Sequence, residues 1–255
     1  MTSYKNRTHR RQLRKTVLMV AFATLAACRA DTIEPANATA TTDDAIYESV
    51  AETRDGIGRS YMGRQISHVM GHRGAAWLER PRREREERTD ILIQHLPLTD
   101  DAVVADIGAG TGYFSFPIAA RVPNGTVLAV DIQPEMLALI EQRRDASDVK
   151  NVETVLSVED DTKLAANTVD LILIVDAYHE FNYPFEMGRS MAAALKPGGR
   201  LILIEYREED ASVPIKRLHK MSEAQARREM QAIGLEFKRT EDFLPQQHFM
   251  VFQKP

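Results

Sequence analysis

Residues 103–112 constrain the fold more than any other part of this 255-residue chain. They read Val-Val-Ala-Asp-Ile-Gly-Ala-Gly-Thr-Gly, a short apolar run followed by three glycines at alternate positions. An apolar run of this length that is rich in Val and Ile predicts a buried strand, and the glycines predict a turn whose backbone comes close to another group. Residues 113–121 then have the apolar spacing of a helix. A strand, a glycine turn and a helix in this order form the nucleotide-binding corner of a doubly wound sheet.

Strands and helices alternate along the chain from residue 102 onward. We expect seven strands, at 102–106, 126–131, 152–156, 169–175, 200–205, 236–243 and 249–253. Helices are expected at 113–121, 134–144, 184–195 and 222–233. This alternation implies a parallel sheet with helices on both faces. Because only a short gap around Pro245 separates the last two strands, they should form an antiparallel hairpin. The predicted fold class is α/β, a doubly wound, mostly parallel seven-stranded sheet with a C-terminal antiparallel hairpin at one edge.

Two motifs carry a resemblance to a known family. The glycines are spaced G-x-G-x-G rather than in the dinucleotide pattern G-x-G-x-x-G, and Asp106 stands two residues before the first of them. Residues 195–201 read Leu-Lys-Pro-Gly-Gly-Arg-Leu, a tight turn into a strand. Together these motifs resemble the class I S-adenosylmethionine-dependent methyltransferases over roughly residues 102–203. The resemblance implies the Rossmann-like methyltransferase fold, S-adenosylmethionine as the cofactor and methyl transfer as the reaction.

The same resemblance assigns residues to the cofactor. Asp106, at the carboxyl end of the first strand, would hold the methionine amino group, directly or through water. Asp131, which ends the next strand 25 residues later, would accept hydrogen bonds from the ribose hydroxyls. The helix N-terminus at Gly112 would offer its positive dipole to the methionine carboxylate. The remaining expected contacts are the backbone of the glycine turn, the adenine face and the rim of the site: Gly108, Ala109, Gly110, Ile132 and Gln133.

Three adjacent acids, Glu159, Asp160 and Asp161, follow the third predicted strand. The family usually has one acid near this position, and that acid holds the adenine amino group. We favour Asp160, and then Asp161, for this contact. At least two of the three acids would then belong to a solvated loop.

The fourth predicted strand leads into residues 174–181, Ile-Val-Asp-Ala-Tyr-His-Glu-Phe, where the family places groups near the transferring methyl. By this resemblance Asp176 and Tyr178 line the methionine end, and Tyr178 and His179 are the predicted catalytic residues. The ordinary pKa of a histidine lies near neutrality, so His179 is a candidate general base. The alternative is a histidine that hydrogen-bonds the backbone and shapes the pocket. Glu180 is a candidate to orient His179.

No metal site is predicted. His68 and His72 are spaced i, i+4, which would place both on one face of a helix. A metal there would need further ligands, and Gly71 disfavours the helix. The surrounding segment either forms a lid, with Tyr61 and His72 in the acceptor pocket, or packs against the sheet.

Residues 44–98 are expected to form a helical extension or lid ahead of the methyltransferase domain at 99–255. A short helix is predicted at 44–52 and a longer one at 79–95. In the second helix, the charged run at 82–88 places opposite charges about one turn apart. This spacing is typical of a solvated helix face.

Residues 1–27 predict an export signal. They carry six Lys and Arg residues and no acid, and they end in an apolar run of about a dozen residues, too short for a stable membrane anchor. Residues 25–28, Leu-Ala-Ala-Cys, resemble the lipobox of bacterial lipoproteins, in which the cysteine is diacylated after cleavage. Cys28 is the only cysteine, so no internal disulfide forms; the alternative is an ordinary secretory signal with a chance cysteine. We expect an exported protein, anchored through Cys28 to a bacterial membrane on the periplasmic side, with 28–43 as a flexible tether.

Charge and export together frame the functional alternatives. The whole chain has a net charge of −4, but residues 28–255 carry −10, which argues against a nucleic-acid surface. A small molecule is the default acceptor, because the substrate-facing inserts are short. S-adenosylmethionine is made inside cells, whereas the lipobox predicts a protein outside the cytoplasm. The second reading is therefore an exported, non-catalytic binding domain that kept the fold. The glycine spacing disfavours a nicotinamide oxidoreductase.

Overall fold

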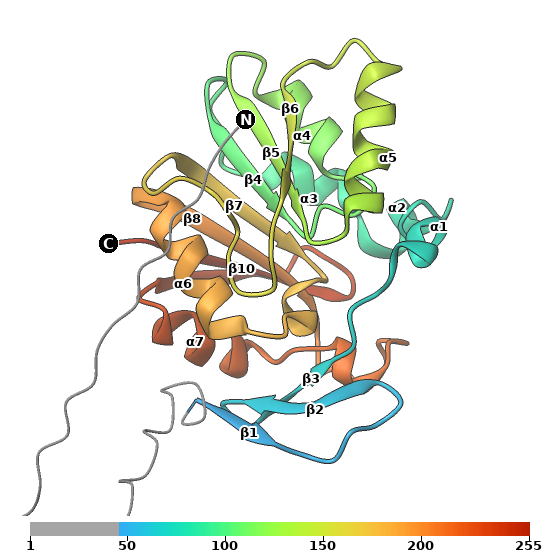
Figure 1. The fold of residues 1–255 in the computed structure, drawn as a ribbon, viewed down its shortest axis with the longest axis vertical. Helices are drawn as coiled ribbons and strands as arrows, with labels where there is room; N and C mark the ends of the chain where they lie inside the picture. Colours follow the sequence, from blue (N-terminus) through green and yellow to red (C-terminus); the bar gives the residue numbers. More distant parts are fainter. Residues whose placement is uncertain (1–45) are drawn as a thin grey trace, which may run out of the picture. The chain divides into compact units, whose positions relative to one another are not determined.

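A seven-stranded sheet in the order β6-β5-β4-β7-β8-β10-β9 organises the part of the chain that the computed structural model describes, residues 46–255 (Figure 1). The predicted segments 1–27 and 28–43 lie outside these residues. The strands are β4 (Val103–Ile107), β5 (Thr126–Asp131), β6 (Val152–Leu156), β7 (Val169–Val175), β8 (Leu195–Tyr206), β9 (Glu236–Glu241) and β10 (Gln247–Gln253). β4 to β8 pair in parallel, and β10 is antiparallel to both of its neighbours. The predicted fold class is confirmed.

Continuous apolar runs place the central strands inside the molecule. Val104 and Ala105 of β4 belong to different core clusters, because successive side chains of a strand point to opposite faces. One cluster includes residues of α3 (Thr89–His95), α4 (Ser115–Arg121) and α5 (Pro134–Asp145). The other includes residues of α6 (Pro184–Ala194) and α7 (Glu223–Ala232). Helices therefore cover both faces, and the strands read as apolar runs rather than as alternating patterns.

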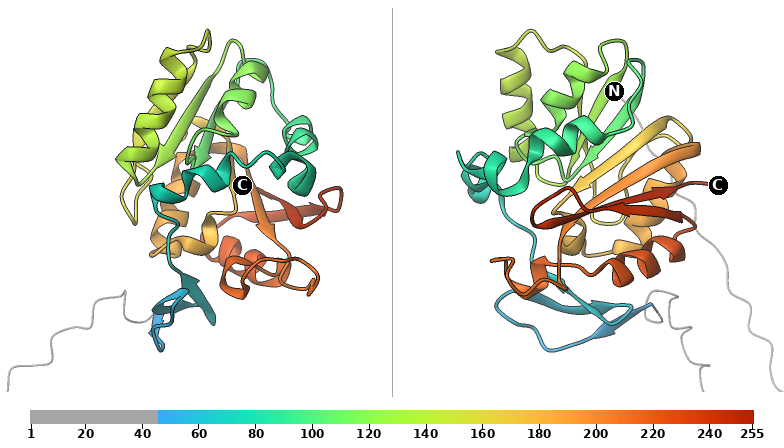
Figure 2. Two further views of the ribbon diagram at one scale, coloured as in Figure 1. Left: turned by 90° about the vertical axis from the view of Figure 1, so that its right-hand side faces the viewer. Right: turned by 180° about the vertical axis from the view of Figure 1, so that it is seen from behind.

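The segment ahead of the main sheet differs from the predicted helical extension. Three strands, β1 (Tyr47–Ser49), β2 (Gly56–Tyr61) and β3 (Arg64–Ser67), form a separate antiparallel sheet. Figure 2 shows this small sheet apart from the main one and beside η4 (Arg217–His219), which β3 contacts. The helix expected at 44–52 is therefore wrong over the described residues: Tyr47–Ser49 form a strand with one buried residue followed by two exposed ones.

The helix expected at 79–95 is divided. η2 (His72–Gly74) and α1 (Ala75–Leu78) precede α2 (Arg83–Glu87), and α3 follows directly. Arg88 lies between α2 and α3 in the left-handed region, with φ 53°, and a residue in this conformation ends a helix. The motif at 195–201, predicted as a tight turn into a strand, lies wholly within β8, where Gly198 has φ 77°.

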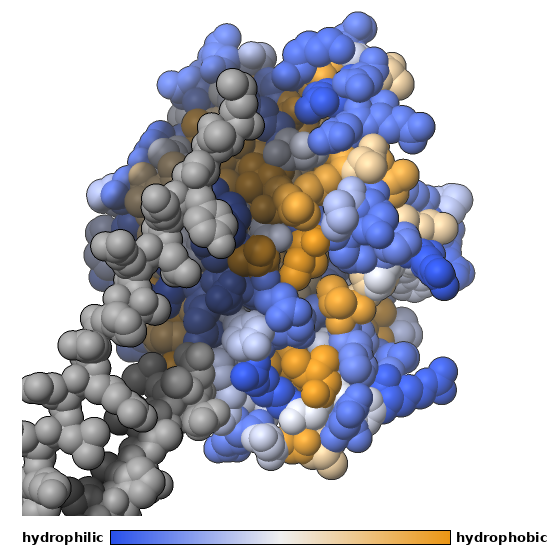
Figure 3. All heavy atoms as spheres, in the orientation of Figure 1, coloured by the Kyte–Doolittle hydropathy of each residue, from blue (hydrophilic) through white to orange (hydrophobic). Residues whose placement is uncertain are grey.

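The described surface mixes apolar and charged residues. In Figure 3 apolar side chains gather toward the middle of the face drawn, with hydrophilic residues along its outer margins. Exposed large apolar side chains include Ile132, Leu139 and Leu156. Among residues 46–255, no helix combines the length and the apolar character needed to cross a bilayer.

Candidate active site

A cavity of about 600 Å³ opens at the carboxyl ends of β4, β5 and β7. The chain order reverses at β4, whose neighbours are β5 on one side and β7 on the other. Open α/β sheets bind their ligands at such a switch point, and the volume is within the range of small-molecule sites. The glycine turn identified in the sequence therefore lies at the switch point of the sheet, where a ligand site is expected.

The glycine turn forms one wall of this cavity. Gly108, Gly110 and Gly112 have φ values of 74°, 55° and 75°, which glycine adopts without strain. The N–H groups of Gly108 and Ala109 donate to the carbonyl of Val130, at 2.9 and 3.0 Å. Gly108 and Gly110 line the cavity, whereas Ala109 and Gly112 are buried behind the turn. The turn is therefore fastened to β5 and presents backbone to the ligand.

Asp131 connects this turn to the end of β5. Its carboxylate accepts hydrogen bonds from the N–H groups of Gly110, at 2.8 Å, and Gln133, at 2.9 Å. Burial raises the pKa of Asp131, although these backbone donors oppose the shift. Asp131, Ile132 and Gln133 all line the cavity, where they were expected. Gln133 also holds the segment opposite, because its side chain donates to the carbonyl of Met70 at 3.0 Å.

Asp106 lies behind the turn rather than on the cavity wall. Its carboxylate accepts a hydrogen bond from the Ser115 hydroxyl at 2.6 Å, and only 3% of the residue is exposed. Burial raises the pKa of Asp106 to about 6, with the Asp131 charge adding to the rise and Ser115 opposing it. The carboxyl group is consequently costly to keep charged when nothing positive is nearby.

The acid run after β6 is arranged differently from the prediction. Glu159 lines the cavity, and the side chain of Asn182 donates to it at 3.0 Å. Asp160 and Asp161 do not line the cavity. Asp161 instead pairs with Lys163 at 2.8 Å, which lowers the pKa of Asp161 to about 2. The geometry therefore favours Glu159 over Asp160 and Asp161 for the adenine end.

Asp176 and Tyr178, which follow β7, lie in different surroundings. Asp176 lines the cavity with φ 50° and accepts a hydrogen bond from Gln247 at 2.7 Å. Burial raises the pKa of Asp176, and the charges of Glu87 and Glu205 raise it further. Tyr178 does not line the cavity: it is fully buried, with its ring 5.3 Å from that of Phe181. The geometry thus corrects the expected place of Tyr178 at the methionine end.

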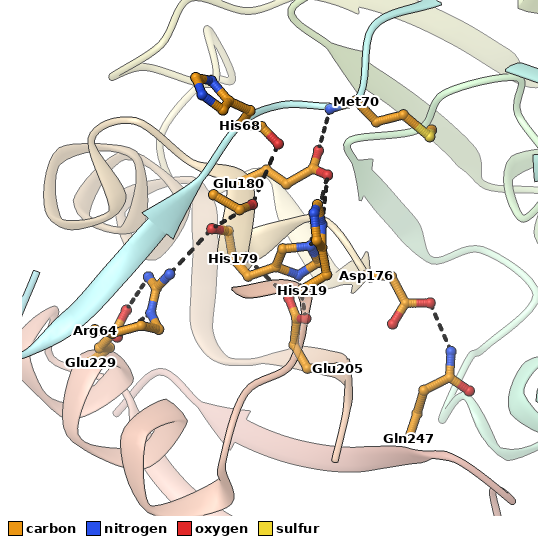
Figure 4. A network of polar contacts seen from close by, with 11 residues as sticks. Arg64, His68, Met70, Asp176, His179, Glu180, Glu205, His219, Glu229 and Gln247 are labelled. Carbon is orange, nitrogen blue, oxygen red and sulfur yellow. Dashed lines mark hydrogen bonds and ion pairs between the residues drawn. The ribbon is translucent and has the colours of Figure 1, made fainter. Parts of the chain in front are cut away.

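His179 lies in a cluster of acids and imidazoles at one end of the cavity (Figure 4). Its Nδ1 is 2.6 Å from Glu205 Oε2, and its Nε2 is 3.1 Å from His219 Nδ1. Its backbone N–H donates to Glu205 Oε1 at 3.2 Å. Burial alone would lower the pKa of His179, but Glu205, with a contribution from Glu180, raises it. The carboxylate that orients the ring is Glu205, while Glu180 Oε1 lies 3.7 Å from Nε2.

The sequence reasoning missed Glu205 and His219. Glu205 is a fully buried acid near the end of β8, so a polar residue closing an apolar strand was an available signal. His219 lies 40 residues after His179 in a connecting segment, and no periodicity marks it.

The segment ahead of the main sheet supplies another wall. Its lining residues are Val69, Met70, Trp77, Leu78, Arg80, Arg83 and Glu87. Tyr61 and His72, which were expected there, do not line the cavity. The charged run is also not solvated throughout: Arg83 pairs with Glu87 at 2.9 Å, and both are buried. The i, i+4 spacing fits a buried pair as well as an exposed one, so the sequence could not separate them.

Residues 105–201 match the family model of a methyltransferase domain. The tRNA U34 carboxymethyltransferase of Desulfotalea psychrophila is 30% identical over 118 residues, 46% of this chain and 37% of that protein. The ubiquinone/menaquinone biosynthesis C-methyltransferase UbiE of Pasteurella multocida is 33% identical over 105 residues, 40% of this chain and 39% of that protein. The chain thus spans less than half the length of these two curated relatives.

A solved structure supports the fold. The SAM dependent methyltransferase from Aquifex aeolicus superposes with a TM-score of 0.69 and 22% identity, covering 73% of this chain and all of that one. This likeness shows the Rossmann-like methyltransferase fold. The family model itself covers residues 105–201, which include the glycine turn, Asp131 and His179.

Proposed function

We propose that this chain binds S-adenosylmethionine in the cavity and transfers its methyl group to a small-molecule acceptor. The observation that carries the proposal is the glycine turn, fastened through Gly110 to the buried carboxylate of Asp131 at the switch point of the sheet. The matching methyltransferase domain supports the same activity. That match disfavours the non-catalytic binding domain, as does the presence of Asp106, the three glycines of the turn and Asp131.

The residues of the cavity fit the parts of this cofactor. Gly108 and Gly110 let the nucleoside approach the backbone, and Asp131 has carboxylate oxygens for the ribose hydroxyls. Asp106, buried behind the turn, offsets the positive charge of the methionine end. When bound, the sulfonium supplies an activated methyl group. The protein contributes alignment of the acceptor and exclusion of water, which the wall from residues 69–87 provides.

A small-molecule acceptor fits the size and the lining of the cavity. Trp77 and Leu78 cover one side, and Pro214 and Ile215 from the segment after β8 cover another. One of the two relatives acts on tRNA by its name, and the other takes part in quinone biosynthesis. The negative net charge of residues 28–255 favours a small-molecule acceptor over a nucleic acid in this chain. His179, which Glu205 orients from behind, lines the cavity and is proposed to face the reacting atom of the acceptor.

Calorimetric titration of the full chain tests the cofactor. We expect one S-adenosylmethionine or S-adenosylhomocysteine site per chain, and a higher melting temperature with either ligand because both bind only the folded state. Asp131→Asn should weaken binding by roughly 10- to 100-fold, since a hydrogen bond to a charged group contributes about 1.5–3 kcal/mol. NADH should give no heat. Heat with NADH and none with S-adenosylmethionine would refute the proposal.

We also propose that the chain is exported and held at a bacterial membrane through lipid on Cys28. The basic head, short apolar run and Leu-Ala-Ala-Cys ending support this. Cys28→Ser is expected to move the protein from the membrane fraction to the soluble fraction, because an acyl chain supplies about 0.8 kcal/mol per buried CH₂. Fractionation followed by immunoblotting measures the shift. Equal membrane content in the two chains would contradict the anchor.

A further inference from the structure

Three metal-ligating side chains converge at the acceptor end of the cavity. Nε2 of His179, Nδ1 of His219 and Oε1 of Glu180 lie 3.1, 3.5 and 3.7 Å apart. All three residues line the cavity, and Figure 4 shows their side chains close together. We propose that they bind one divalent transition metal ion, for which Zn²⁺ is the best chemical match, and that the fourth position of this ion faces the acceptor.

The spacing of the three atoms fits a metal better than it fits hydrogen bonds alone. Zn–N and Zn–O bonds of about 2.0–2.1 Å at tetrahedral angles separate the ligand atoms by roughly 3.3–3.4 Å. The three observed separations lie on both sides of this value. The two separations that involve Oε1 of Glu180 are too long for good hydrogen bonds, so hydrogen bonds do not account for the approach of this oxygen to the two imidazoles. Two imidazoles and one carboxylate with an open fourth position form a known catalytic zinc ligand set.

Each of two ligands is held by a partner that leaves its metal-facing atom available. Glu205 accepts from Nδ1 of His179 at 2.6 Å, which leaves the Nε2 lone pair directed at the cluster. A ligating histidine commonly has such a carboxylate partner. The backbone N–H of Met70 donates to Oε2 of Glu180 at 2.9 Å, which leaves Oε1 toward the imidazoles.

The backbone behind the cluster is fixed as well. Arg64 of β3 donates to the carbonyl of His179 at 3.2 Å and pairs with buried Glu229 of α7 at 2.7 Å. His179 is nearly inaccessible, with 2% of its side chain exposed, whereas His219 has 25% exposed. The cluster therefore has one deeply fixed ligand and one ligand on the segment that closes the cavity. An ion would join that segment to the end of β7.

At its fourth coordination position the metal would activate the acceptor. This role of the metal rests on the proposed function. An acceptor hydroxyl or thiol that binds the ion there loses its proton to solvent more readily, because a bound cation stabilises the anion. The oxygen or sulfur anion then attacks the methyl carbon. Its bond to that carbon forms as the sulfonium–methyl bond breaks, and the electron pair of the broken bond stays on the sulfur of S-adenosylhomocysteine. The acceptor class is thus a small molecule with an ionisable hydroxyl or thiol.

Metal binding to the full chain tests the site without any methyl transfer. After treatment with a chelator, the protein is titrated with Zn²⁺ against a chromophoric chelator, and separately with Co²⁺ in the visible range. We expect one ion per chain and the absorption of a tetrahedral Co²⁺ complex. His219→Ala, at a partly exposed residue, should weaken binding at least 100-fold. Glu205→Gln should weaken it roughly 10- to 100-fold, as expected for a partner of a ligand.

His248→Gln is the matched control. His248 also pairs with one carboxylate, that of Glu209 at 2.9 Å, but it lies outside the cluster. This variant should bind the metal as the unchanged chain does. No stoichiometric binding, or equal affinity in His219→Ala, overturns the site. If the metal binds and S-adenosylmethionine does not, the methyl-transfer proposal fails and the metal site stands; the reverse result rejects the metal site alone.

Discussion

Replacing Gly108 by alanine is expected to abolish S-adenosylmethionine binding while leaving a folded protein. A Cβ at this position would lie 2.7 Å from Cβ of Ala177, a distance at which one of the two backbones must move. Gly108 and Ala177 both line the cavity, so either movement deforms the ligand site. We expect at least a 100-fold loss of affinity by calorimetry. The left-handed backbone adds a stability cost of roughly 1–2 kcal/mol.

Gly63→Ala is the matched control for this substitution. Gly63 also has a positive φ, 85°, but no atom lies within 4 Å of an added Cβ. It belongs to the turn between β2 and β3 and does not line the cavity. Gly63→Ala should lose stability through its positive φ alone, and Gly108→Ala should lose at least as much in urea denaturation because of the added clash. Only Gly108→Ala should lose the cofactor. Wild-type affinity in Gly108→Ala would show that the ligand does not approach this turn.

Asp106→Asn is expected to stabilise the ligand-free protein above pH 6 and to weaken cofactor binding. The pKa of Asp106 is about 6 in the folded chain, against an ordinary value of 3.8. The folded state therefore holds the proton more tightly than the unfolded state does. Between these two pKa values the stability falls as the pH rises. At pH 8 the buried charge of Asp106 lowers the free energy of unfolding by about 2–3 kcal/mol. An uncharged amide at this position carries no such cost.

Urea denaturation from pH 4 to pH 8 measures this difference. The gap in the free energy of unfolding between Asp106→Asn and the unchanged chain should open between about pH 4 and about pH 6. Affinity for S-adenosylmethionine should fall roughly 10- to 100-fold in the variant, because the neutral amide no longer offsets the positive charge of the methionine end. Asp161→Asn is the control of opposite sign: its pKa is lowered to about 2, so this substitution should not stabilise the chain. A less stable Asp106→Asn protein at pH 8 would contradict the argument.

The sequence predicts the centre of the main sheet well because β4, β5 and β7 are buried on both faces. β5, β6 and β7 have the predicted bounds, and each is a short run rich in Val, Ile or Leu. The segment ahead of β4 was predicted poorly for the opposite reason. β1 has one buried residue followed by two exposed ones, so its composition does not separate a strand from a short helix.

The site divides along similar lines. Asp131 and the glycines could be found because they follow one another closely in the chain and the fold fixes their meeting point. His219 could not, because it reaches His179 only through the path of a connecting segment. Arg83 and Glu87 were misread because their spacing is the same on a solvated helix as on a cavity wall. Neighbours in sequence were predictable, whereas partners brought together by tertiary packing were not.

The position of β10 has a consequence for how the sheet is completed. β10 lies between β8 and β9, although it follows both of them in the chain. Among the described strands, β9 pairs only with β10, so the edge of β8 stays open and β9 stays unpaired until β10 enters between them. Any change that displaces β10 would therefore expose two strand edges at once, and open strand edges favour association between chains.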